Sequence, residues 1–176
     1  MVKNKYTQII SDMTEWGNTI SSLLFFQKEI CKLNNWHYSE IWQLDKSEKF
    51  MVWAGYWSSN DTHFERFSRY SSYFKFAKGI GIIGKAWKAK QPVVFDDLVN
   101  ERTFLRTDIL IKARLNSSII IPVVQGEKLI NVISVYFNKV TETDIKECEV
   151  IFNLLKEISL DENHINPDKA YLTNLK

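Results

Sequence analysis

Two apolar stripes of helical spacing, one near each end of the chain, constrain the possible fold most strongly. Within residues 5–32, apolar side chains recur at alternating steps of four and three residues, a heptad-like pattern interrupted by Gln27. A second stripe runs through residues 141–159. We therefore expect a helix in each segment. The first stripe must be buried, either against the domain's own sheet and last helix or in the seam of a dimer, and the two alternatives are compatible.

Strand-like patterns fill the chain between the two stripes. Residues 36–44 alternate, and one face of that segment collects the large apolar residues Trp36, Tyr38, Trp42 and Leu44. Residues 50–57 are apolar on both faces, so the two segments are expected to pair as an antiparallel hairpin. A second pair of strands is expected over residues 117–124 and 129–137.

Shorter elements complete the predicted order. They are a helix near residues 63–68, an edge strand in 70–78, a helix after the glycines of 79–84, a strand in 91–97 and a helix over about 105–114. Because most of the predicted strands are antiparallel and helices flank them on both faces, this order indicates an α+β fold.

Length, charge and terminal sequence limit the class of protein. The 176 residues suit one domain, which we place at residues 1–160, and residues 161–176 lack periodicity and are expected to form a loosely ordered tail. The 23 Lys and Arg residues nearly balance the 21 Asp and Glu residues and do not cluster, so we expect no nucleic-acid partner. Because no long apolar run is present and the N-terminus is polar, we expect no membrane partner and a cytoplasmic location.

A glycine-rich segment invites comparison with phosphate-binding loops. Gly79, Gly81 and Gly84 form a G-x-G-x-x-G pattern. A dinucleotide site needs this pattern inside a parallel βαβ unit, whereas the flanking elements here are predicted to be antiparallel. We therefore interpret these glycines as a tight turn that leads into a helix.

The histidines and cysteines do not form a recognisable catalytic or metal-binding set. His37, His63 and His164 are isolated, so we expect no metal site. Cys31 and Cys148 fall on or beside the apolar stripes of the first and last helices, where a buried, inert thiol is typical. If these helices pack together, the two thiols could be neighbours, which keeps a thiol-based redox enzyme as a third alternative. Without a nucleophile, a metal set or a paired acid and base, we expect that the protein is not an enzyme.

Six short segments occur in an informative order between residues 10 and 158. They are residues 38–42 (YSEIW), 78–87 (KGIGIIGKAW), 91–97 (QPVVFDD), 103–106 (TFLR), 113–123 (ARLNSSIIIPV) and 140–144 (VTETD). In this order and spacing they resemble the GAF domain family, the small-molecule sensing modules of signalling proteins. The chain departs from the family pattern near Asn131, where glycine is usual, and at Val140, where phenylalanine is usual.

The resemblance implies a specific architecture and a place for a ligand. A GAF-like antiparallel sheet of five to six strands would lie between the terminal helices and a layer of pocket-side helices and loops. The cavity would lie between the sheet and residues 70–90 and 97–114, and the terminal helices would pack on the other face, often as a parallel dimer. The candidate ligand-binding residues are aromatic side chains in the walls and two charged side chains at the mouth: Trp53, Phe74, Phe76, Trp87 and Phe104, with Asp97 and Arg106.

The known chemistries of the family do not identify a cofactor. Bilin attachment and the reduction of free methionine sulfoxide both need cysteines near the pocket, and residues 32–147 contain none. The cyclic-nucleotide signature and an iron-binding set are also missing, and His63 alone remains as a haem ligand. The cofactor is therefore left unknown.

The resemblance leads to one expected function and one main alternative. We expect a sensor that binds a small molecule, forms a homodimer through its N- and C-terminal helices and acts in signal transduction through a separate output protein, such as a kinase or regulator. The alternative is a ligand-free dimerisation or interaction scaffold whose pocket is filled by its own side chains.

Overall fold

The computed structural model describes residues 5–59, 61–158 and 160. The elements in chain order are α1 (Thr7–Thr14), α2 (Thr19–Asn34), β1 (Tyr38–Leu44), β2 (Phe50–Ser58), α3 (Thr62–Ser71), β3 (Lys75–Ala77), α4 (Gly81–Ala89), β4 (Val93–Phe95), α5 (Thr107–Lys112), β5 (Ser117–Gln125), β6 (Lys128–Phe137) and α6 (Glu142–Glu157). The predicted tail over residues 161–176 lies outside the described residues.

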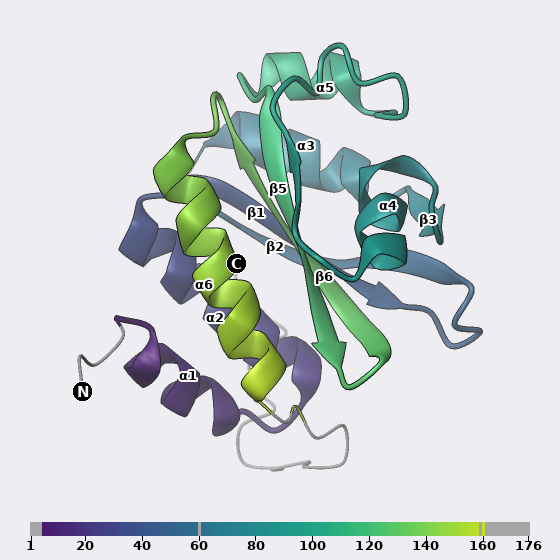
Figure 1. The fold of residues 1–176 in the computed structure, drawn as a ribbon. Helices are drawn as coiled ribbons and strands as arrows, with labels where there is room; N and C mark the ends of the chain where they lie inside the picture. Colours follow the sequence, from purple (N-terminus) through teal and green to yellow (C-terminus); the bar gives the residue numbers. More distant parts are fainter. Residues whose placement is uncertain (1–4, 60, 159, 161–176) are drawn as a thin grey trace.

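One antiparallel sheet organises the molecule. Its six strands in the described chain follow the order β3-β2-β1-β6-β5-β4. Helices α2 and α6 cover one face, while α3 and α4 lie over the other and α5 packs against α3 (Figure 1). The predicted α+β fold, with five to six antiparallel strands between two helical layers, is therefore confirmed.

The N-terminal segment differs from the single helix predicted over residues 5–32. It forms two helices, because the chain turns between Glu15 and Asn18. Asn18 is extended, and its side chain accepts a hydrogen bond from the Ser21 N–H at 2.9 Å, which caps the start of α2. Gly17, a poor helix former, lies just before this cap.

The apolar stripe of this segment is buried within the domain. Met13, Leu23 and Ile30 are fully buried in the chain's own core. Its polar interruption also has a partner, since the side-chain amide of Gln27 donates to the Ser39 hydroxyl of β1 at 2.9 Å. The stripe therefore packs against the domain's own sheet, and a homodimer through the terminal helices stays a prediction.

The segment after β2 contains more helix and less strand than predicted. Helix α3 extends to Ser71 rather than ending near Ser68, and only Lys75–Ala77 of the predicted strand over 70–78 pairs with β2. Phe64, Phe67 and Ser71 recur at helical spacing and are buried, which explains the longer helix. The helix predicted over about 105–114 is likewise shorter, at Thr107–Lys112.

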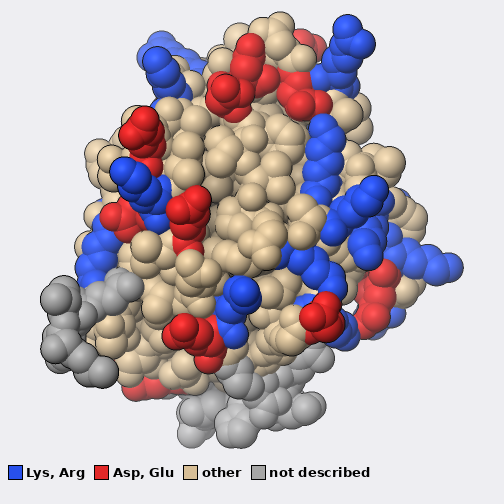
Figure 2. Space-filling view, in the orientation of Figure 1, with Lys and Arg blue, Asp and Glu red and all other residues tan. Residues whose placement is uncertain are grey.

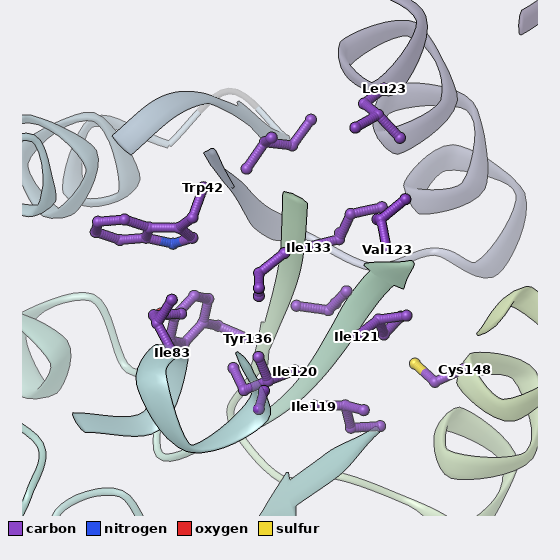
Figure 3. Close-up of a cluster of buried hydrophobic side chains, with 14 of the residues drawn as sticks. Leu23, Trp42, Ile83, Ile119, Ile120, Ile121, Val123, Ile133, Tyr136 and Cys148 are labelled. Carbon is purple, nitrogen blue, oxygen red and sulfur yellow. The ribbon is translucent and has the colours of Figure 1, made fainter. Parts of the chain in front are cut away.

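The two faces of the sheet form two parts of one core. Figure 3 shows Trp42, Tyr136 and Ile83 on the side of α4, and Ile121 with Cys148 on the side of α6. All five side chains are at most 1% exposed. Because successive residues of a strand point to opposite faces, each buried strand contributes to both layers.

The described surface has no strongly charged face in the view of Figure 2. Basic and acidic side chains are interspersed around the margin, and an uncharged area lies between α6 and α4. No helix among the described residues is both long enough and apolar enough to cross a membrane.

Candidate functional site

Strands β1 and β6 present a set of polar and aromatic side chains to the face covered by α3 and α4. Tyr38, Glu40 and Trp42 alternate along β1, so they share one face. Tyr136 of β6 pairs with Tyr38 in the antiparallel register and joins the same face. All four side chains are no more than 1% exposed. A carboxylate buried in this way needs a partner.

Arg106, at the start of α5, supplies that partner. Its side chain is 1% exposed, and its Nη1 lies 2.9 Å from Oε2 and 3.3 Å from Oε1 of Glu40. Nη1 also donates to the Ser71 hydroxyl of α3, and Nη2 donates to the Tyr136 hydroxyl at 2.6 Å. The ion pair thus connects α3, α5 and two central strands.

Each hydroxyl group around this ion pair donates its proton to a particular acceptor. Tyr38 donates to Oε1 of Glu40 at 2.7 Å, and Tyr136 donates to Oε2 at 3.2 Å. Ser71 donates to the carbonyl oxygen of Phe67 at 2.9 Å. The hydroxyls of Ser71 and Tyr136 therefore offer only lone pairs to Arg106.

Aromatic rings surround the guanidinium. Its central carbon lies 4.9 Å from the ring centroid of Phe67, 5.1 Å from that of Phe104, 5.4 Å from that of Trp42 and 5.6 Å from that of Tyr136. These distances are within the range of cation–π attraction. We call the four rings together with Glu40 and Ser71 the guanidinium cage.

The environment of the cage sets the protonation of its members. Burial, reinforced by the nearby Glu40, raises the pKa of Tyr38 well above its usual value, and burial also raises the pKa of Tyr136. Both phenols therefore remain protonated as donors to Glu40. Burial opposes the charge of Arg106, but the adjacent Glu40 carboxylate outweighs this effect and keeps the pKa of Arg106 above its ordinary value.

One donor of the guanidinium group has no partner. The Nε atom of Arg106 is buried and makes no hydrogen bond. A buried N–H without an acceptor is costly, so the cage is not a complete match for this arginine side chain.

A hollow on the surface lies beside Arg106. It has a volume of about 340 Å³ and is lined by Tyr70, Leu105, Arg106, Thr107, Asp108, Ile109 and Lys112. Tyr70 and Leu105 are 45% and 60% exposed. The hollow is therefore the solvent-filled space that borders the segment carrying Arg106.

Three of the predicted binding residues lie in or beside the cage. Phe104 is one of the four rings of the cage and Arg106 fills it, while Phe76 packs against the cage ring Trp42 with ring centroids 5.1 Å apart. Arg106 is thus buried in the interior, not at a mouth as the sequence suggested.

The other predicted residues lie outside the cage. Phe74 stacks on Phe76 with ring centroids 6.2 Å apart, and Trp53 packs beside Tyr56 on β2 with ring centroids 6.2 Å apart. Trp87 is buried in α4. Asp97 is exposed in the loop after β4, where it accepts hydrogen bonds from Asn100.

The sequence reasoning missed Glu40, Tyr38, Trp42, Tyr136, Phe67 and Ser71 as site residues. The sequence did contain a pattern that indicates Glu40. It lies two residues from both Tyr38 and Trp42, and therefore on the predicted apolar face of its strand. A carboxylate at such a position predicts a buried partner, and the chain contains one in Arg106.

The two cysteines lie away from the cage. Cys31 belongs to α2 and Cys148 to α6, and both are fully buried between these helices and the opposite face of the sheet. Burial raises the pKa of each thiol, which disfavours the reactive thiolate. Within the described ranges, no three His, Cys, Asp or Glu side chains gather in a way that could hold a metal ion.

Glu101 anchors the loop that leads to Phe104 and Arg106. Its carboxylate accepts from the Thr103 hydroxyl at 2.6 Å and the Thr103 N–H at 3.0 Å, and it lies 3.2 Å from Lys85 Nζ of α4. Hydrogen bonding by Thr103, followed by the contact with Lys85, lowers the pKa of Glu101 from 4.5 to about 2.

A change at Glu101 should alter the stability at acidic pH. A carboxyl group with a lowered pKa in the folded state contributes stability above its unfolded pKa and loses it as the pH falls through the folded pKa. We expect the free energy of unfolding of Glu101→Gln to depend less on pH between 4.5 and about 2 than that of the original protein. Urea titrations across this range measure the difference. Glu157→Gln, at the exposed end of α6, is the control, and equal slopes for both variants would contradict this assignment.

Comparisons with known proteins agree on the fold. A family model described as the GAF domain matches residues 24–160. No sequence among the curated proteins matches the chain.

Solved structures give the same result at low sequence identity. A free methionine-R-sulfoxide reductase from Neisseria meningitidis, in complex with its substrate, has 16% identity and a TM-score of 0.64, with 84% of this chain and 80% of that chain covered. The GAF domain of a phosphoenolpyruvate-protein phosphotransferase from Coxiella burnetii has 14% identity and a TM-score of 0.66, with 84% and 86% covered. A protein described as a GAF sensor from Burkholderia vietnamiensis has 16% identity and a TM-score of 0.61, with 93% and 91% covered. These likenesses establish the shared fold.

Proposed function

Because this chain belongs to the GAF domain family, we propose that it is a sensory domain whose small-molecule site is the region of the guanidinium cage. The observation that supports this location is the ion pair between Arg106 and Glu40, which is buried on the face of the sheet covered by α3 and α4, with a surface hollow beside Arg106. Ligand pockets commonly combine apolar walls with a few oriented polar groups.

The same region supports binding more than catalysis. The Glu40 carboxylate is already held by Arg106, Tyr38 and Tyr136, and both cysteines of the chain lie across the sheet from it. A reductase that used these thiols would need them at the substrate. We therefore propose that the domain binds its ligand without transforming it.

Signal output would involve the other face of the sheet. We propose that the domain acts in the cytoplasm as a homodimer through α1, α2 and α6, and that a separate output protein receives the signal. Strand β1 offers a physical connection, because Glu40 faces the cage while its neighbour Ser39 bonds to Gln27 of α2. A ligand that displaced Glu40 would therefore act on a strand that contacts α2 directly.

A ligand-free scaffold is the second candidate, and a specific observation favours it. The cage is already filled by the chain's own Arg106. In this alternative the ion pair only stabilises the fold, and the terminal helices supply the function.

A small-molecule screen distinguishes the two candidates. The isotope-labelled protein is titrated with a library of cationic, anionic and neutral metabolites, and the NMR signals of Trp42 and Tyr136 are followed. The sensor proposal predicts saturable shifts of both signals with at least one class of compound, and weaker binding by Glu40→Gln. Native mass spectrometry of the same sample reports a retained small molecule and the oligomeric state. A dimer of bare chain mass with no compound acting on these signals would support the scaffold and reject the sensor.

A further inference from the structure

The polar groups around Arg106 are arranged to receive a cation. The guanidinium meets one carboxylate, that of Glu40, and two hydroxyl oxygens, those of Ser71 and Tyr136. Both hydroxyl protons are engaged elsewhere, on the Phe67 carbonyl and on Glu40. If Arg106 withdrew, the cage would therefore still present only acceptors to an incoming group.

The walls of the cage favour the same class of ligand. The rings of Trp42, Phe67, Phe104 and Tyr136 all lie within 6 Å of the guanidinium carbon and can attract a cation placed there. A carboxylate or phosphate in the same place would face Glu40, which is fully buried. Like charges in such a desolvated site repel strongly.

We propose that the guanidinium cage is a binding site for a small compound with a guanidinium or amidinium group, and that Arg106 is an internal competitor that closes the site. The inference rests on the proposed sensor function and names the ligand class of the same site. Binding consists of an exchange: the guanidinium of Arg106 leaves the cage, and the planar cation of the ligand takes its hydrogen bonds to Glu40, Ser71 and Tyr136.

Two observations support an exchange over a permanent ion pair. The buried Nε of Arg106 has no acceptor, so the internal group leaves one donor unsatisfied. An amidinium ligand, which has two NH2 groups and no equivalent of the Nε–H, avoids this cost. Arg106 also belongs to the wall of the surface hollow, next to Asp108. The hollow is therefore the nearest solvent-filled space that a displaced Arg106 side chain could enter, and the Asp108 carboxylate there could receive it.

Methylguanidine is a suitable probe of this exchange. In the original protein we expect saturable shifts of the Trp42 indole N–H and the Arg106 Nε–H, and faster hydrogen exchange at the latter as it leaves the cage. Because an internal competitor reduces the apparent affinity by the fraction of time that the site is open, Arg106→Ala should bind methylguanidine at least about tenfold more tightly. Arg102→Ala, which removes an exposed arginine from the same loop, should bind like the original protein.

Neutral and anionic probes complete the design. Methylurea, with the same shape and no charge, and acetate should produce no saturable shift. Binding of methylguanidine by Arg106→Ala but not by the original protein would overturn the proposal, because the cage would then be permanently closed. Preferential binding of acetate, or no binding of methylguanidine to either protein, would overturn it as well. If Arg106→Ala does not fold, the titration of the original protein decides alone.

The result can be separated from a failure of the sensor proposal. If another class of metabolite shifts the Trp42 and Tyr136 signals while methylguanidine does not, only the ligand class is wrong. If no compound of any class shifts them, the proposed sensor function fails too.

Discussion

Replacing Arg106 with alanine is expected to lower the free energy of unfolding by about 3–5 kcal/mol, since it leaves a buried carboxylate without its counter-charge. Glu40 is fully buried, and after the change only Tyr38 and Tyr136 would donate to it. The change also empties the space among four aromatic rings, which adds a packing cost. Urea unfolding followed by tryptophan fluorescence gives the difference, provided that the denaturant slope is unchanged.

Companion variants separate the buried charge from the loss of packing. Glu40→Gln should cost a similar amount, since it leaves the Arg106 cation buried and only partly compensated. The double variant Glu40→Gln with Arg106→Met removes both charges at similar volume and should recover to within about 1–2 kcal/mol of the original protein. Arg102→Ala, on the exposed side of the same loop, should change stability by less than about 0.5 kcal/mol. A loss below about 1 kcal/mol for Arg106→Ala would mean that the ion pair is not buried in solution.

Much of the scaffold around this ion pair could be predicted from the sequence. Strand alternation and the two hairpins come from local periodicity, and the six segments that resemble the GAF family placed these elements in one topology. The break between α1 and α2 was harder to predict, because the apolar stripe continues through it. The break is caused by Asn18, whose side chain caps the start of α2 and so competes with a continuous helix. In the sequence, this cap can be recognised only from the pair Gly17-Asn18.

The arrangement of the site could be predicted only in part. Arg106 and Phe104 were identified as site residues, but their depth was not, because Arg106 and Glu40 are 66 residues apart in the sequence. Only the folded sheet and the loop after β4 bring them together. Asp97 shows the reverse case: its side chain is used locally to bond Asn100, a short-range role that a search for pocket residues overlooks.

Strand β1 contacts the ion pair on one face of the sheet and helix α2 on the other. Because β1 alternates, a displacement of Glu40 toward or away from the cage moves Ser39 and Ile41 on the opposite face. Ser39 contacts Gln27 of α2, and that hydrogen bond is buried. Exchange at Arg106 could thus be transmitted as a small shift of α2 without unfolding any element.

The position of α4 over the cage depends on Gly84, and a single added methyl group there should disturb it. A Cβ atom at Gly84 would lie 2.2 Å from the carbonyl oxygen of Ala77 and 3.1 Å from the N of Gly79. Both are backbone atoms, so neither can move aside as a side chain would. Alanine is the better helix former by about 1 kcal/mol, but the forced separation of α4 from β3 should outweigh this gain. We expect Gly84→Ala to lose about 2–3 kcal/mol of stability.

Gly126→Ala is the matched control for this prediction. Gly126 lies in the turn between β5 and β6 with φ at +54°, and a Cβ atom there meets no heavy atom within 4 Å. Its cost is therefore limited to the backbone conformation, about 1 kcal/mol. Equal losses for the two variants in urea unfolding would show that α4 does not approach β3 closely in solution. The NMR signals of Phe76 and Trp42 give a second measurement, since Phe76 precedes Ala77 in β3 and packs on Trp42, and both should shift in Gly84→Ala but not in Gly126→Ala.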